Sequence, residues 1–175
     1  MEAVIAETLI GHLKRSTREA FEYLRKQSEK VTPEEAGLYS SANWPSHKFG
    51  IGQDGSISGI VYHVAAWKFM TLPLLSEGGT MREISDLEAV EKPLREDYTA
   101  LVEWLAEIGN AWNTALDRLS EEAFLQTRKW GTETVTVAQY VEEMRMHDIQ
   151  HAAQIEYLKQ RILFDREEKE RTNLP

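Results

Sequence analysis

The stretch "TVAQYVEEMRMHDIQHAAQIEYLKQRIL", residues 136–163, carries the pattern that decides the fold. Its apolar and aromatic side chains recur at steps of three and four residues, which is the period of an amphipathic helix. Thr136 and Gln139 have the spacing of a capping box, in which each side chain bonds the other residue's backbone N–H. The stretch therefore predicts a long helix over residues 137–164.

Three further segments carry the same period, and no segment shows the alternation of a strand or an internal repeat. Residues 37–56 are rich in Gly, Ser and Asn and predict a long loop that ends in a helix N-cap at Ser56 or Ser58. Residues 130–134, "WGTET", predict a turn with room for a short extended pair. The fold class predicted is an all-α four-helix bundle in one domain over residues 1–175, with helices at about 3–28, 57–76, 93–119 and 137–164.

Composition limits the chemistry and the partners. The chain has no cysteine, so it forms no disulfide and offers no thiol nucleophile, and a metal ion would use His, Asp, Glu or water. The net charge of −9 repels phosphate backbones, so we expect no nucleic-acid partner. The first residues contain no long apolar segment, so we expect no signal peptide, no membrane partner and a cytoplasmic location.

Three of the five histidines fall on predicted core-facing positions. His147 and His151 are four residues apart on the apolar stripe of the fourth helix, and His63 lies on the core-facing side of the second. Imidazoles from two facing helices can converge on a divalent metal and leave one coordination position open. The spacing alone leaves open that they are three separately hydrogen-bonded core histidines. We expect His12 and His47 to be peripheral.

Two other metal sites are disfavoured. His147 to His151 reads H-D-x-x-H, and its Asp148 is one methylene shorter than the glutamate that serves as general base in H-E-x-x-H proteases. Candidate acidic third ligands downstream, Glu167, Glu168 and Glu170, lie in the charged run 165–171. A di-iron bundle needs two Glu-x-x-His motifs, which the chain lacks. Asp148 is one residue off the apolar stripe, so we expect an exposed carboxylate, with a hydrogen-bond acceptor for a metal ligand or a general base as the alternative.

Two motifs carry a resemblance to a known family. "SISGIVYHVAAWKF" (56–69) and "HDIQHAAQIEYLKQ" (147–160) resemble the second-helix and fourth-helix motifs of the DinB/YfiT-like superfamily, L-x-x-H-x-x-x-W and H-x-x-x-H-x-x-Q-I. The positions that match are His63, Trp67, His147, His151, Gln154 and Ile155. Ala153 stands where glycine is commoner in the family, a difference that affects packing rather than ligation.

The resemblance implies an up-down-down-up bundle with a divalent metal, usually zinc or nickel, on His63, His147 and His151. It also implies a homodimer and a range of activities, among them thiol transfer with bacillithiol or mycothiol and maleylpyruvate isomerisation. We expect an S-transferase that joins a low-molecular-weight thiol of the bacillithiol type to a small electrophilic substrate. The alternatives are a non-catalytic bundle that binds metal or ligand, and a metal-dependent hydrolase.

A cationic anchor and a hydrogen-bond partner for a histidine are also expected near the metal. Thiol cosubstrates of this kind carry carboxylates, so a cationic anchor is expected near the metal, and its candidates are Arg145, Lys48, His47 and Lys68. Gln154 follows His151 by three residues and is predicted to hold one of the histidines or to shape the helix packing, with a plain surface glutamine as the alternative. No catalytic residue is predicted.

Overall fold

The structure, a computed structural model, describes residues 2–41, 51–88 and 97–172, with side chains from residue 9 onward. Its four long helices are α1 (Glu2–Glu29), α4 (Ile57–Thr71), α6 (Tyr98–Arg118) and α8 (Val137–Thr172). The shorter elements are α2 (Pro33–Ala36), the 3-10 helix η1 (Leu72–Leu75), α7 (Glu121–Leu125), β1 (Thr127–Trp130) and β2 (Glu133–Thr136). The expected start of the third helix near residue 93 lies outside the described residues. Within these ranges, every helix is too short or too polar to serve as a transmembrane span.

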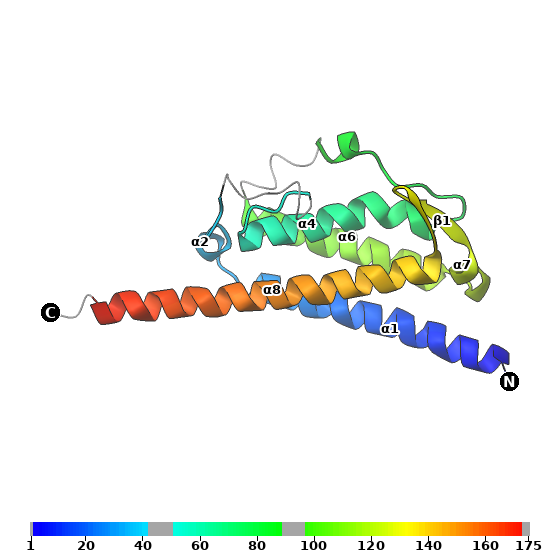
Figure 1. Ribbon diagram of the computed structural model, residues 1–175, viewed down its shortest axis with the longest axis horizontal. Helices are drawn as coiled ribbons and strands as arrows, with labels where there is room; N and C mark the ends of the chain where they lie inside the picture. The colour runs from blue at the N-terminus through cyan, green and yellow to red at the C-terminus, as the bar shows by residue number, and fades with distance from the viewer. Residues whose placement is uncertain (1, 42–50, 89–96, 173–175) are drawn as a thin grey trace.

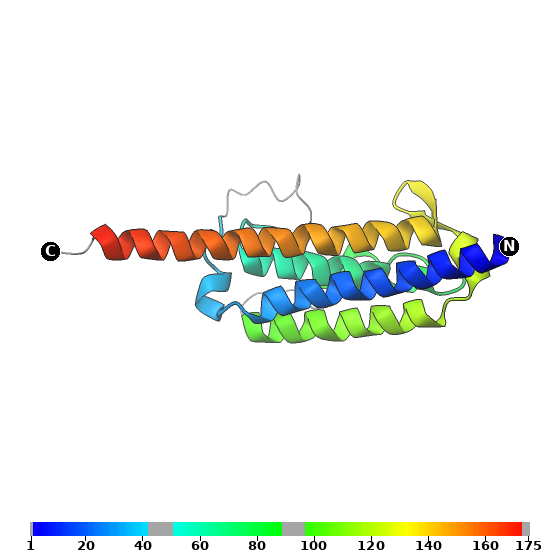
Figure 2. The ribbon, with the colours of Figure 1, turned by 90° about the horizontal axis from the view of Figure 1, so that it is seen from below.

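The long helices form an up-down-down-up bundle. Figures 1 and 2 show α1 and α8 running in one direction and α4 and α6 in the opposite direction. α1 packs against α8 and α6, and α4 packs against α6 and α8. The end of α8 continues past the other helices (Figure 1). The predicted all-α four-helix bundle, with this order of directions, is confirmed.

Local signals place the ends of the two helices that carry the histidines. Ser56 caps α4, and its hydroxyl accepts the backbone N–H of Gly59 at 2.9 Å. α4 gives way to η1 at Pro73, which has no N–H to donate to the preceding turn. The capping box before α8 is present as predicted: Gln139 Oε1 accepts the Thr136 N–H at 2.9 Å, and the reciprocal bond is 3.2 Å.

β1 and β2 form a small antiparallel hairpin ahead of α8, which is the turn and extended pair predicted at "WGTET". Trp130 pairs with Glu133 across a turn in which Gly131 has a φ of +60°. That backbone conformation favours glycine, which has no Cβ to clash with its own carbonyl. The Trp130 ring packs edge-on against Tyr140 of α8, with ring centroids 5.5 Å apart. This contact fixes the hairpin beside the first turns of α8.

The expectation of an exposed Asp148 is wrong. Its side chain is 0% exposed and accepts a hydrogen bond from Lys68 Nζ at 2.8 Å, and Lys68 is itself 1% exposed. The Lys68 ammonium also lies 4.7 Å from the ring centroid of Trp112 and 5.0 Å from that of Phe21. α8 packs against both α1 and α4, so its buried surface is wider than one stripe, and Ala152 one turn later is also fully buried.

Candidate metal centre

The structure brings the three predicted histidines together. His63 on α4 and His147 and His151 on α8 each offer a ring nitrogen, and these nitrogens all lie within 4.8 Å of one another. The Nε2 atoms of His63 and His147 are 3.0 Å apart. Zn–N bonds of about 2.0–2.1 Å in a tetrahedral shell place two ligand nitrogens about 3.4 Å apart, so the spacing suits one small divalent ion. His12 is exposed on α1 and outside this group, as predicted.

Two of the rings are held by oxygen acceptors on their outer nitrogens. His63 Nδ1 lies 2.9 Å from the carbonyl oxygen of Ile51, and His151 Nδ1 lies 2.7 Å from Oε1 of Gln154. An oxygen acceptor requires the proton on Nδ1, which leaves the Nε2 lone pair free for a metal. The prediction that Gln154 holds a histidine is confirmed.

The three rings are neutral at physiological pH. Burial, with help from the neighbouring imidazoles, lowers the pKa of His63 to about 4 and that of His147 to about 2. Burial also lowers the pKa of His151, although its bond to Gln154 opposes the shift. Only a neutral imidazole can donate a lone pair to a metal, so the protonation states match the donor set.

His147 differs from the other two ligands. Its Nδ1 is buried and has no hydrogen-bond partner among the described residues. Because no acceptor among these residues meets Nδ1, the described part of the chain fixes the tautomers of His63 and His151 but not that of His147. The donor chemistry of the three rings fits a divalent metal ion, and the three can hold one.

A cavity of about 300 Å³, here called the histidine cavity, opens beside the triad. Its wall contains His63 and His147. The rest of the described lining is largely aromatic and thioether, with one carboxylate and one amide: Trp67, Trp130, Met144, Met146, Glu143 and Gln150. Because Glu143 and Gln150 are exposed at its edge, the cavity reaches the surface. Two of the three histidines therefore face a space that a small molecule can enter.

The expected cationic anchor is not found among its described candidates. Arg145 donates to Glu142 at 2.8 and 2.6 Å and does not line the histidine cavity. Lys68 is used in the buried ion pair, so its assignment as an anion anchor is wrong. Lys48 and His47 lie outside the described residues.

Sequence reasoning missed Glu143. This residue is four positions before His147, so it is on the same face of α8 one turn earlier, and its carboxylate joins the cavity wall. The i, i+4 relation to a predicted ligand was the signal available in the sequence. Glu143 is the acidic side chain in the described lining of the cavity.

The chain belongs to the DinB superfamily, whose sequence pattern matches residues 8–155. Among solved structures, it is similar to YfiT from Bacillus subtilis, with 17% sequence identity, 87% of each chain covered and a TM-score of 0.63. That protein is described as "a probable metal-dependent hydrolase with an unusual four-helix bundle topology". At this identity the likeness shows the shared fold. The curated proteins contain no match to the chain.

Proposed function

We propose that the protein is a metal-dependent enzyme in which His63, His147 and His151 hold a divalent ion, zinc or nickel. The supporting observation is a set of three neutral imidazoles with nitrogens within 4.8 Å, two of them in the wall of an open cavity. Three protein ligands and an accessible neighbouring space are typical of catalytic metal sites, whereas structural sites are closed by four protein ligands. This favours an enzyme over the non-catalytic bundle.

The reaction proposed is transfer of a small thiol of the bacillithiol type to a small electrophile. The chain has no cysteine, so the sulfur must come from a cosubstrate. The aromatic and thioether wall of the histidine cavity suits an apolar electrophile. When bound, the ion supplies Lewis acidity, which lowers the pKa of a thiol or water that enters its free position.

The chain's own residues then have separate roles. Ile51 and Gln154 hold two of the rings in the tautomer that a metal needs. Glu143 is the group in the cavity wall that can accept the proton released by the thiol. The sulfur forms a bond to the electrophilic carbon, and the leaving group departs with the electron pair of the bond that breaks.

A second candidate is a metal-dependent hydrolase, which the description of YfiT supports. The same three histidines and the same carboxylate would serve a water nucleophile in place of the thiol. We also propose a small-molecule substrate, no nucleic-acid or membrane partner, a homodimer and a cytoplasmic location. The net charge of −9 supports the absence of nucleic acid.

Metal analysis of the purified protein tests the site. We expect stoichiometric zinc, nickel or manganese in the wild-type protein and in the control His12→Ala, whose ring is exposed and is not part of the triad. His151→Ala should lose the metal while it keeps its helical circular dichroism. Wild-type protein that takes up none of these metals would exclude the site.

Turnover assays separate the two reactions. Metal-loaded protein is mixed with bacillithiol and monochlorobimane, and in parallel with p-nitrophenyl acetate in the absence of thiol. Thiol-dependent conjugation that falls in His151→Ala and in Glu143→Gln supports the transferase. Ester hydrolysis that falls in His151→Ala and in Glu143→Gln, without any thiol conjugation, supports the hydrolase instead.

A further inference from the structure

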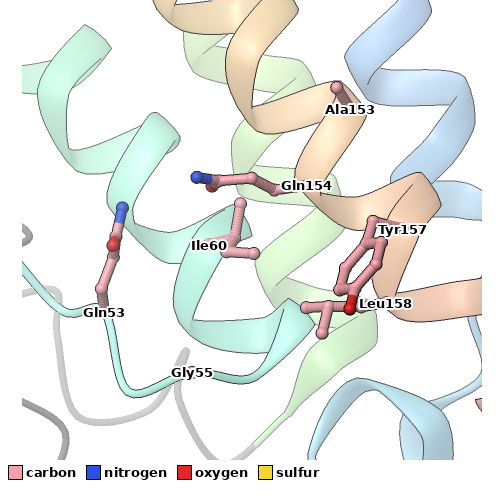
Figure 3. Close-up of a pocket in the computed structure, with 7 residues that line it drawn as sticks. All are labelled: Gln53, Gly55, Ile60, Ala153, Gln154, Tyr157 and Leu158. Atoms are coloured by element: carbon pink, nitrogen blue, oxygen red, sulfur yellow. The ribbon is translucent and has the colours of Figure 1, made fainter. Parts of the chain in front are cut away.

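A second cavity lies beside the triad, at the opposite end from the histidine cavity. We call it the distal cavity; its volume is about 430 Å³. Figure 3 shows its lining, which comes from α8, from α4 and from the segment before α4: Gln53, Gly55, Ile60, Ala153, Gln154, Tyr157 and Leu158. Its volume lies in the range of cavities that enclose small organic molecules.

The order of residues along the two helices places the triad between the cavities. On α8, the histidine cavity uses residues 143–150 and the distal cavity uses residues 153–158, with His151 between them. On α4, the distal cavity uses Ile60, which precedes His63 by one turn. The distal cavity is therefore a separate space, and a molecule inside it would not occupy the histidine cavity.

One side chain of the distal cavity is polar, buried and unpaired. Gln53 is only 9% exposed, and its amide has no hydrogen-bond partner in the described part of the chain. An amide whose donor and acceptor positions are open in a mostly apolar cavity can bond a ligand or an ordered water. Gln53 lines the distal cavity, so a molecule in that cavity can supply the missing partner.

Gln154 supplies a second polar group to the same space. Its Oε1 is occupied by the Nδ1–H of His151 at 2.7 Å, which leaves its NH₂ group as a donor. In Figure 3 this amide extends from α8 toward the side of the cavity where Gln53 lies. The cavity thus offers one free donor group from Gln154, and both a donor and an acceptor from Gln53.

The remaining lining selects against charge. The seven described lining residues are uncharged, and Ile60 and Leu158 give the cavity an apolar wall. Against these residues an ionised ligand would lose its hydration without gaining a counter-ion. We propose that the distal cavity is a second small-molecule site, which binds an uncharged, largely apolar molecule that carries an amide or carbonyl group. This site goes beyond the proposed metal-dependent reaction.

The test uses acetanilide, an uncharged aromatic amide. Two comparison probes are toluene, which lacks the amide, and benzoate, which carries a negative charge. Binding to the full chain is measured by saturation-transfer NMR, and dissociation constants come from titration. The protein is treated with a chelator beforehand, so the outcome does not depend on the proposed metal. We expect acetanilide to bind with a dissociation constant of about 1 mM or below, the range for a ligand of this size. Benzoate should bind about tenfold more weakly.

Two variants locate the binding. Ala153→Trp, at an exposed position on the cavity rim, fills the space and should abolish acetanilide binding. The matched control Ile149→Trp, on the same helix but outside the lining, should bind as the wild type does. Gln53→Leu should weaken acetanilide about tenfold and leave toluene unchanged, because only the amide partner is lost.

Several outcomes would overturn the proposal. These are no saturable acetanilide binding by the wild type, wild-type binding by Ala153→Trp, or equal acetanilide affinity in Gln53→Leu. Circular dichroism of each variant confirms that it is folded. Wild-type protein that takes up no metal in the metal analysis but binds acetanilide would refute the metal site and keep the distal cavity, so the two proposals fail separately.

Discussion

Replacement of Lys68 by Met should destabilise the bundle by about 4 kcal/mol, since single-partner removal from a buried ion pair costs about 3–5 kcal/mol. Lys68 and Asp148 join α4 to α8 at 2.8 Å, and their side chains are 1% and 0% exposed. Met keeps the length and apolar contacts of the lysine stem and removes only the ammonium. The variant therefore leaves the Asp148 carboxylate in the core without a counter-ion.

The magnitude follows from two opposing terms. At the separation of 2.8 Å and an effective dielectric constant of about 20, the attraction between the charges is about 6 kcal/mol. Desolvation costs several kcal/mol for each ion, so the intact pair is close to neutral for stability. Burial raises the pKa of the Asp148 carboxyl, and Lys68 opposes that shift. Without Lys68 the desolvation cost of Asp148 is no longer offset.

Urea denaturation of chelator-treated protein at pH 7 measures the free energy of unfolding of four chains: wild type, Lys68→Met, Asp148→Asn and the double variant. We expect the double variant to lose less than the sum of the single variants by about 2 kcal/mol or more, because it leaves no uncompensated charge. Arg145→Met, which removes a partly exposed pair with Glu142, should cost less than about 1 kcal/mol.

The reasoning would be refuted if Lys68→Met cost less than about 1 kcal/mol, the scale of an exposed pair. Strict additivity of the two single variants would refute it as well, because it would mean that the two charges do not interact.

Two further substitutions test the core by thermal unfolding, each against a matched control. Tyr140→Phe should cost about 1–3 kcal/mol, since the N–H of the buried Trp112 donates to the Tyr140 oxygen at 3.0 Å and would lose its acceptor. Its control is Tyr157→Phe, at a position 66% exposed, which should change stability by less than about 0.5 kcal/mol. Gly109→Ala should cost about 2 kcal/mol or more, because the new Cβ would lie 1.8 Å from Cζ of the buried Phe21 ring on α1. Gly11→Ala, with nothing within 4 Å, should stabilise α1 by about 0.5–1 kcal/mol. Equal effects within either pair would contradict the described packing.

The parts of the fold that local sequence determines could be predicted. The capping box at Thr136 consists of four consecutive residues. The sequence offers Ser56 and Ser58 as N-caps of the second helix, and the structure uses Ser56. The grouping of His63 with His147 and His151 followed from their places on apolar stripes, because two helices of one bundle turn those stripes toward each other. The hydrogen bond from His151 to Gln154 is likewise local, since residues three apart share a helix face.

The parts that depend on how many neighbours a helix has could not be predicted. A single apolar stripe on α8 predicts a solvent-exposed Asp148, but α8 has neighbours on two sides. Lys68 lies on α4, which is buried around most of its circumference, so its charge needs a buried partner. That partner, Asp148, is far away in the sequence and cannot be identified from a local pattern. The distal cavity is lined by Gln53, from the segment before α4, together with Gln154 of α8. Such contacts arise only once the helices are packed.

The buried ion pair also bears on how the proposed metal would act. His147 and Asp148 are neighbours on α8, and both contact α4, the first through His63 and the second through Lys68. α4 and α8 are thus joined by a charged contact and by packed core residues that need no metal. A site held in place in this way does not depend on the ion for folding, unlike structural zinc sites, whose binding energy is their folding energy. The bundle can therefore preorganise three imidazoles around an exchangeable ion, which is the arrangement that a catalytic site requires.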